Sequence, residues 1–221
     1  VDLSYTTIQG NPAISSYTDP SGRPYSFGYS DENLASYTAP GQPTLSFGYS
    51  EPDSGSGYVR NISSLSLPGG RDYQYSYDGD NRVTRMIDPA GAITTYTYSG
   101  SQQIVTDAEN RVTTITRDAN GDVTSIVRGG KTFSYTWSDR MLTSMQNPGS
   151  GSTVSYGYRT TSQGVKQISS VTNGAGQSYQ YSFDANDRVK TVVLPNGDRS
   201  TMLWDSNGQR TGVQSPDGTQ V

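Results

Sequence analysis

The stretch YQYSYDGDNRV at residues 73–83 contains the pattern that decides the fold. In its first half three tyrosines alternate with polar residues, as in a β-strand whose two faces meet different surroundings. A cluster of Asp, Gly and Asn follows, and these residues favour a tight turn. A second apolar run then begins at Val83. The stretch therefore predicts two strands joined by a turn, which is a β-hairpin.

The same pattern returns along nearly the whole chain. We name the last residue of each aromatic strand segment the anchor residue, and six of the eight spacings between successive anchors are 19–21 residues. The two longer spacings contain Ser- and Gly-rich insertions at residues 53–57 and 159–164, which we expect in loops, because added loop length costs little closure entropy. The nine anchors are Tyr29, Tyr49, Tyr77, Tyr98, Arg117, Trp137, Tyr158, Phe183 and Trp204.

A second turn signal follows each hairpin, such as DPAG at residues 88–91 and PNG at residues 195–197. Turns roughly every 8–12 residues are typical of an all-β chain. One detail conflicts with simple strand alternation, because apolar residues three apart would point to opposite faces. Either a β-bulge corrects the alternation, or both faces of the sheet are partly covered. The pairs in question are Val112 and Ile115, Val123 and Ile126, and Val189 and Val192.

Composition excludes several classes of protein and site. The 221 residues include no Cys and no His, which removes disulfides, thiolate metal sites and Ser-His-Asp triads. The net charge of −4 argues against a nucleic-acid surface, and no apolar run approaches the ~18 residues of a membrane-spanning helix. Only three Glu and three Lys stand against 17 Asp, so a mainly helical chain is not expected.

These repeats resemble the YD-repeat, or Rhs-repeat, family, whose units carry a Y-x-Y-D motif, a Gly and a later D-P-x-G-like turn. The resemblance extends over residues 19–221 and is carried by YSYD at 75–78, DPAG at 88–91 and YSFD at 181–184. The chain departs from the motif where Arg117 and Trp204 replace the aromatic Tyr, and where no Asp follows the anchors Tyr29, Tyr49 and Tyr158.

The resemblance implies an all-β fold of about nine tandem antiparallel β-hairpins, each of about 20 residues. They would form one long curled sheet, a segment of a hollow β-shell. Sheet geometry agrees, since ~18 strands at ~4.8 Å would make a ribbon of roughly 85 Å, and open sheets rarely exceed ~10 strands without curling. We expect residues 1–221 to be a single array and a fragment of a much longer protein, since Val1 replaces an initiator Met and residues 215–221 resemble the start of another unit.

By this resemblance the chain would be a non-enzymatic structural segment of a shell that encapsulates a toxic C-terminal effector domain for delivery. Its partners would be that domain and the remaining repeats of the parent protein, with self-association through open strand edges. We expect neither cofactor, nor nucleic acid, nor membrane span. The protein would be secreted or displayed on a bacterial surface, after a cytoplasmic stage before export.

Repetition indicates a structural role for the residues of the motif. The turn DANGD at residues 118–122 and the turn DSNG at 205–208 could offer oxygens to calcium, but Asp-capped turns explain them better. The Arg residues near the turns, at 82, 111, 188 and 210, are expected to pair with Asp of adjacent hairpins, as in Asp187–Arg188. The structural repeat residues are Tyr29, Tyr49, Tyr77, Asp78, Tyr98, Asp118, Gly121, Trp137, Tyr158, Phe183, Asp184, Trp204 and Asp205.

Two further functions stay open. Trp137 and Trp204 could stack on sugar rings, which would make the chain a surface or adhesion module that binds carbohydrate or a protein partner. Cross-strand pairing of the same rings is the simpler explanation. A ligand site would fit better at a local departure from the repeat, such as residues 53–57. A carbohydrate-active enzyme is the third and least supported alternative, because 17 scattered Asp make any catalytic pair arbitrary.

Overall fold

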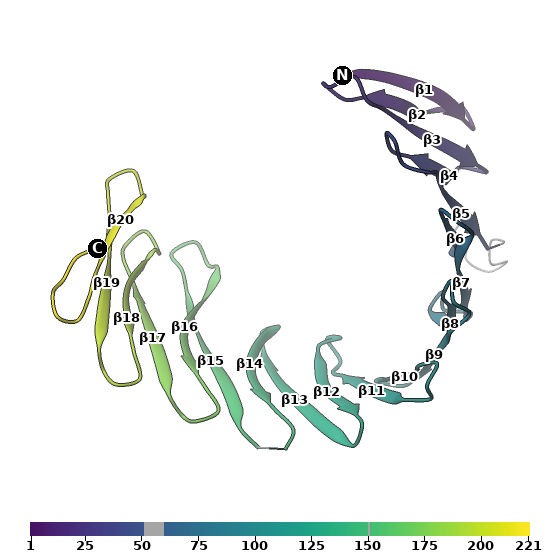
Figure 1. Cartoon of the computed structure of the whole chain (residues 1–221). Coiled ribbons are helices and arrows are strands. Elements are labelled where there is room, and N and C mark those ends of the chain that lie inside the picture. The colour runs from purple at the N-terminus through teal and green to yellow at the C-terminus, as the bar shows by residue number, and fades with distance from the viewer. Residues whose placement is uncertain (51–59, 150) are drawn as a thin grey trace. The chain divides into compact units, whose positions relative to one another are not determined.

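The computed structural model describes residues 1–50, 60–149 and 151–221, so the insertion at 53–57 lies outside the described residues. These residues form twenty β-strands, and none of them is helical (Figure 1). The predicted all-β fold of antiparallel hairpins is therefore confirmed. The strands are β1 Asp2–Ile8, β2 Asn11–Thr18, β3 Pro24–Ser30, β4 Asn33–Thr38, β5 Leu45–Tyr49, β6 Ile62–Leu67, β7 Arg71–Tyr77, β8 Val83–Ile87, β9 Ile93–Ser99, β10 Gln102–Thr106, β11 Val112–Arg117, β12 Val123–Arg128, β13 Lys131–Ser138, β14 Met141–Gln146, β15 Thr153–Thr160, β16 Lys166–Thr172, β17 Ser178–Phe183, β18 Val189–Val193, β19 Arg199–Trp204 and β20 Arg210–Gln214.

The chain divides into two compact units. Unit 1 comprises residues 1–99 and 103–112, and unit 2 comprises residues 100–102 and 113–221. In unit 1 each strand from β1 to β9 pairs antiparallel with the next, and β9 pairs with β10. In unit 2 the strands from β11 to β20 pair in the same sequential way. Within a unit, each hairpin therefore leans on its neighbours in sequence, as in other repeat proteins.

Every anchor lies at or near the end of an odd-numbered strand, from Tyr29 on β3 to Trp204 on β19. The sequence pattern did not predict the first hairpin, β1–β2, in which Tyr5 takes the anchor position. That hairpin has no Asp after its aromatic residue, and its strands extend past Tyr5 to a turn at Gln9 and Gly10. The described residues thus contain ten hairpins rather than nine.

A β-bulge beside the anchor resolves the conflict over residues three apart. Val123 pairs with the anchor Arg117 while Ser125 pairs with Thr116, so Thr124 is an extra residue on β12. Because one residue is inserted, Val123 and Ile126 return to the same face. Val189 and Val192 are brought together in the same way on β18. The pairing of β11 is regular at its start, so Val112 and Ile115 do point to opposite faces.

The two faces of the sheet differ in chemistry. One face carries the rings and aliphatic side chains, as in the cross-strand pairs Phe27–Tyr37, Tyr75–Met86 and Tyr135–Met145. The opposite face carries small and hydroxyl side chains, such as Ser36–Ser46 and Thr136–Ser144. No described residue is fully buried, so the sheet is a single layer without a closed core. Within the described part of the chain, no helix is long and apolar enough to cross a membrane.

Candidate functional site: anchors and their turns

Most anchors link their own hairpin to the one before it. Seven of them donate a hydrogen bond of 2.6–2.9 Å from a ring hydroxyl or indole N–H to a backbone carbonyl of the preceding hairpin. In every case the acceptor is the residue that pairs with the preceding anchor, immediately before the bulge. The donor–acceptor pairs are Tyr29–Ile14, Tyr49–Leu34, Tyr77–Ile62, Tyr98–Val83, Trp137–Val123, Tyr158–Leu142 and Trp204–Val189.

This geometry explains why the anchor is usually Tyr or Trp. A bulge interrupts the regular ladder, and a backbone carbonyl left without a partner is costly away from water. A Tyr hydroxyl or a Trp indole N–H on the next hairpin reaches that carbonyl, whereas Phe cannot donate. Anchor and bulge are thus two parts of one joint between consecutive hairpins.

Two anchors depart from this scheme. Phe183 has no donor, and the guanidinium of Arg159 lies over its ring at 4.4 Å from the centroid instead. Arg117 donates from Nη1 to the carbonyl of Gly121 in its own turn, at 3.2 Å. Both departures are visible in the sequence, but the contacts that replace the missing bond are not.

An aspartate follows four anchors directly and caps the turn. Its Oδ1 accepts the backbone N–H groups two and four residues later, at 2.8–3.0 Å. The residue three positions after the aspartate adopts the left-handed conformation, with φ of 85° at Gly121 and 60° at Asn81. The carboxylates are therefore occupied by their own turns, and the described residues contain no group of three or more acidic residues that could hold a metal ion. The four capping residues are Asp78, Asp118, Asp184 and Asp205.

The prediction that the arginines near the turns pair with aspartates of adjacent hairpins is wrong for three of the four. Arg82 and Arg188 pair with the aspartate that caps their own turn, at 2.8 Å and 2.7 Å, and not with an adjacent hairpin. Arg111 does the same with Asp107 at 2.7 Å. The four-residue separation explains this, since the turn returns the arginine to its own cap. Arg210 has no ion pair within the described residues.

Two of these arginines, Arg82 and Arg188, also contact an anchor ring of the next hairpin. The guanidinium of Arg82 lies 4.5 Å from the ring centroid of Tyr98, and that of Arg188 lies 5.2 Å from Trp204.

Hydrogen bonding from Arg82 holds the pKa of the Asp78 carboxyl below its ordinary value. For Asp184, burial acts in the opposite direction, but the bonds from Arg188 outweigh it and the pKa is lowered.

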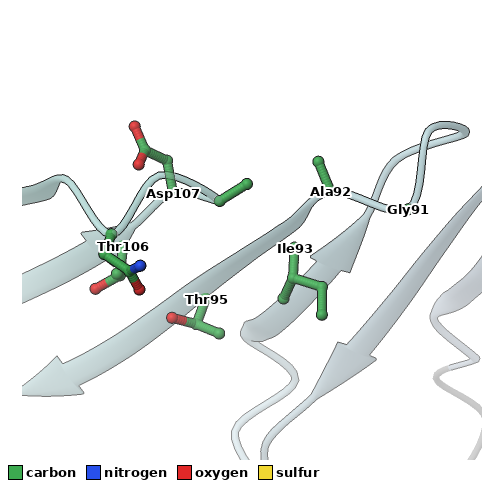
Figure 2. Close-up of a pocket in the computed structure, with 8 residues that line it drawn as sticks. Gly91, Ala92, Ile93, Thr95, Thr106 and Asp107 are labelled. Atoms are coloured by element: carbon green, nitrogen blue, oxygen red, sulfur yellow. The ribbon is translucent and has the colours of Figure 1, made fainter.

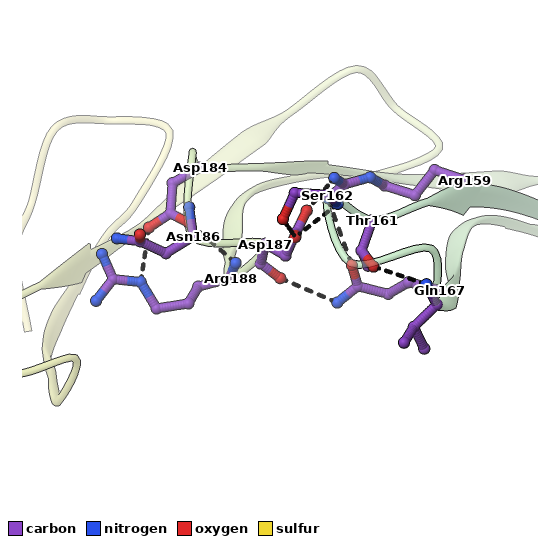
Figure 3. Close-up of polar contacts among 9 residues, drawn as sticks. Arg159, Thr161, Ser162, Gln167, Asp184, Asn186, Asp187 and Arg188 are labelled. Carbon is purple, nitrogen blue, oxygen red and sulfur yellow. Dashed lines mark hydrogen bonds and ion pairs between the residues drawn. The ribbon is translucent and has the colours of Figure 1, made fainter.

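The second insertion, at residues 159–164, is joined to the hairpin that follows it (Figure 3). Asp187 is the centre of this cluster, and its carboxylate accepts bonds from Arg159 and from the Ser162 hydroxyl and backbone N–H. Gln167 donates to the Asp187 backbone carbonyl at 3.1 Å. These bonds, the Ser162 hydroxyl first, lower the pKa of Asp187. Sequence analysis assigned Asp187 to Arg188 and so missed this cluster, since 28 residues separate Arg159 from Asp187.

Trp137 and Trp204 both make structural contacts with the preceding hairpin. Their indole N–H groups donate to Val123 and Val189, and both side chains are partly buried. One face of the Trp204 ring is covered by the Arg188 guanidinium. A sugar that stacked on Trp204 from that side would have to displace this cation.

The hollows of the described surface are shallow. One of about 390 Å³ lies between the turn at Gly91 and the turn at Asp107, and Figure 2 shows Ile93 and Thr95 among the residues that line it. Its carboxylate, Asp107, is already paired with Arg111. The other polar groups of the lining are the hydroxyls of Thr95 and Thr106 and the amide of Asn110, and we assign no chemistry to this hollow.

With this geometry in place, comparison with known families becomes informative. The sequence model of the teneurin YD-shell family matches residues 93–219, which is more than half of the chain. The chain belongs to the teneurin YD-shell family. The Rhs-repeat model matches residues 61–93, so the two matches together extend from β6 to the last turn. The resemblance read from the Y-x-Y-D motif is confirmed.

Solved toxin-complex structures share the fold of this YD-shell chain. A crystal structure of TcdB2-TccC3 without its hypervariable C-terminal region aligns with 99% of the chain, at a TM-score of 0.64 and 14% identity. The TcdB2-TccC3-TEV and TcdB2-TccC3-Cdc42 structures align at TM-scores of 0.54 and 0.51, with 12% and 13% identity. The chain covers only 14–15% of these longer chains.

Proposed function

We propose that this chain is a non-catalytic wall segment of a YD-repeat shell that encloses a toxic C-terminal effector domain. In this proposal residues 1–221 are one stretch of a longer array, and the parent protein carries the effector. The observation that carries the proposal is the repeated joint, in which an anchor donor meets the carbonyl at the bulge of the previous hairpin. A joint of this kind extends a sheet hairpin by hairpin and needs no closed core.

The chemistry of the faces fits a container. A wall works by excluding solvent and proteases rather than by recognising its content, and the Ser, Thr and Gly face offers a folded domain few apolar contacts. Paired strands also leave no gap in the backbone wide enough for a protease, since neighbouring strands lie only ~4.8 Å apart. Fold similarity to TcdB2-TccC3, a complex whose C-terminal region is called hypervariable, supports the proposal.

The partners and location follow from this function. The segment would contact the effector domain and the neighbouring repeats of its parent, and would act outside the producing bacterium or at its surface after synthesis in the cytoplasm. The carbohydrate alternative gains no support at Trp137 and Trp204, whose donors serve the array.

Limited proteolysis of the complete parent protein tests the proposal. We expect its C-terminal domain to survive trypsin at concentrations that digest the same domain expressed alone. Replacing Tyr77 and Tyr98 together by Ala should remove two joints and expose the domain. Tyr96→Phe should leave the domain protected, because the Tyr96 hydroxyl makes no hydrogen bond within the part of the chain that the structure describes. Equal digestion of the enclosed and the free domain would contradict the proposal.

A further inference from the structure

Two tyrosines of unit 1 form an unusually close ring stack. Tyr17 on β2 and Tyr25 on β3 are direct cross-strand partners, and their ring centroids lie 4.3 Å apart with an interplanar angle of 4°. Phe27 stacks less closely on Tyr17, at 6.4 Å. The Tyr37 ring lies against the Phe27 ring, at 5.4 Å and a tilt of 38°. Among the described residues this is the only contact between two tyrosine rings, although the chain has 17 tyrosines.

The stack lies between two hairpins that are joined by the backbone turn and the β2–β3 ladder but by no side-chain covalent bond. Tyr17 belongs to the first hairpin and Tyr25 to the second, and the turn between them is closed by Asp19 and Arg23. The chain has no Cys, so a disulfide cannot connect these strands. Both rings are only partly buried, which leaves them within reach of electron transfer to an external oxidant.

We propose that Tyr17 and Tyr25 are a site of oxidative cross-linking, at which a one-electron oxidant of the peroxidase class converts the stacked pair to dityrosine. Each phenol loses one electron and one proton to the oxidant, and the two phenoxyl radicals form a carbon–carbon bond between ring carbons ortho to the oxygens. The two ring hydrogens at these carbons then move to the oxygens and restore both phenols. Overall, one hydrogen peroxide and two phenols give one biaryl and two water molecules.

Proximity favours this pair over the other tyrosines that the structure describes. Parallel overlap holds the ring carbons of one tyrosine above those of the other before oxidation, so coupling needs only a change in ring tilt and not an encounter between chains. Burial and the neighbouring Tyr25 raise the pKa of the Tyr17 phenol. The product would join β2 to β3 and close a short loop, which restricts the unfolded chain.

Horseradish peroxidase with hydrogen peroxide, applied to the dilute chain, tests the proposal. We expect dityrosine fluorescence in the monomer fraction, and a cross-linked peptide pair containing Tyr17 and Tyr25 in the mass spectrum. Tyr17→Phe and Tyr25→Phe keep both rings and should each lower the monomer signal about tenfold, since no other pair of tyrosine rings among the described residues is stacked in this way. Tyr37→Phe is the matched control, because it removes a phenol from the same group of rings and should keep the full signal.

Two results would overturn the proposal. One is a monomer signal in Tyr17→Phe equal to that of the unchanged chain, which would place the coupling elsewhere. The other is dityrosine found only in covalent dimers, with a yield that falls on dilution. Circular dichroism of each variant is the control for folding: where the spectrum matches that of the unchanged chain, a lost signal reports the missing phenol and not an unfolded chain.

Discussion

The turns along the two edges of the array make different side-chain contacts. The anchor turns, which follow odd-numbered strands, carry contacts from one hairpin to the next: anchor hydrogen bonds, Arg82 over Tyr98, and the pairs Arg159–Asp187 and Arg140–Asp122. The connecting turns, which follow even-numbered strands, keep their described side-chain bonds within the turn, as in Asp19–Arg23 and Asn173–Gln177. Backbone hydrogen bonds between strands run along the whole array. The side with the anchor turns, which we call the anchor side, therefore differs from the other side by its described side-chain bonds between hairpins.

This difference teaches how a single-layer sheet can be stable without a core. With no described residue fully buried, burial of apolar area per residue is small, and each hairpin depends on its neighbours. Among the described residues, the anchor side adds a donated hydrogen bond at seven of the nine anchors and a guanidinium over the ring at three of them. We therefore expect substitutions on the anchor side to cost more than matched substitutions at the connecting turns.

Truncation of an anchor ring should have the largest effect. Trp204→Ala removes a partly buried ring, its bond to the Val189 carbonyl and the surface under Arg188, so we expect the free energy of unfolding to fall by ~2–4 kcal/mol. Leu194→Ala, at the connecting turn beside the same strands, should cost about 1 kcal/mol. Urea denaturation followed by circular dichroism measures both, and equal losses would contradict the distinction between the two sides.

The glycines before three anchors should be the next most sensitive positions. Gly28, Gly48 and Gly157 each face a serine on the partner strand, and a Cβ at Gly48 would collide with the Ser64 hydroxyl. Gly48→Val should therefore destabilise by ~1–3 kcal/mol through overpacking.

A second substitution tests this cause. Ser64→Gly, added to Gly48→Val, should restore part of the loss because it vacates the colliding hydroxyl. Gly79→Ala is the matched control, since nothing lies within 4 Å of its Cβ position and its φ is not left-handed, and it should leave stability nearly unchanged. Failure of Ser64→Gly to compensate would show that the strand itself, not the crowding, rejects Val.

Removal of one anchor hydroxyl should have a smaller effect. Tyr98→Phe deletes the 2.9 Å bond to the Val83 carbonyl and should cost about 1 kcal/mol. Tyr96→Phe, two residues earlier on the same face of β9, removes a hydroxyl that bonds to no other described residue and should cost a few tenths of a kcal/mol at most. Equal costs for the two substitutions would mean that the joint contributes nothing beyond ring packing.

Lowering the pH should reduce the free energy of unfolding on both sides of the array, by less than any of the substitutions above. The pKa values of Asp78 on the anchor side and Asp107 on the connecting side are lowered, mainly by hydrogen bonds from Arg82 and Arg111. A lowered folded-state pKa adds stability above the unfolded value of about 4, and this stability is lost as pH falls through the folded value. The effect is small because these pairs are exposed and screened by solvent.

Urea midpoints at pH 7 and pH 3 measure this loss. Asp78→Asn and Asp107→Asn should each reduce the difference between the two midpoints by a similar amount, because both caps act within their own turn. If only Asp78→Asn reduced the difference, the acid response would belong to the links between hairpins and not to the turns.

Much of the fold could be predicted because the information is local. Alternating Tyr73, Tyr75 and Tyr77 specify one face of a strand, and the residues from Asp78 to Arg82 specify a turn whose cap and left-handed position lie within five residues. The first hairpin escaped prediction because Tyr5 lacks those turn residues. The bulge was foreseen only as one of two explanations, since a spacing of three residues does not say which strand carries the extra one.

The sequence by itself determined the all-β class, the period, the turns and the family, because strand alternation and turn chemistry act between residues a few positions apart. Only the tertiary structure decided which carbonyl each anchor meets, that Asp187 takes Arg159 instead of Arg188, and that Tyr17 stacks on Tyr25. These contacts depend on the register between strands. Register is the sum of many ladder bonds and side-chain pairs, and no single motif records it.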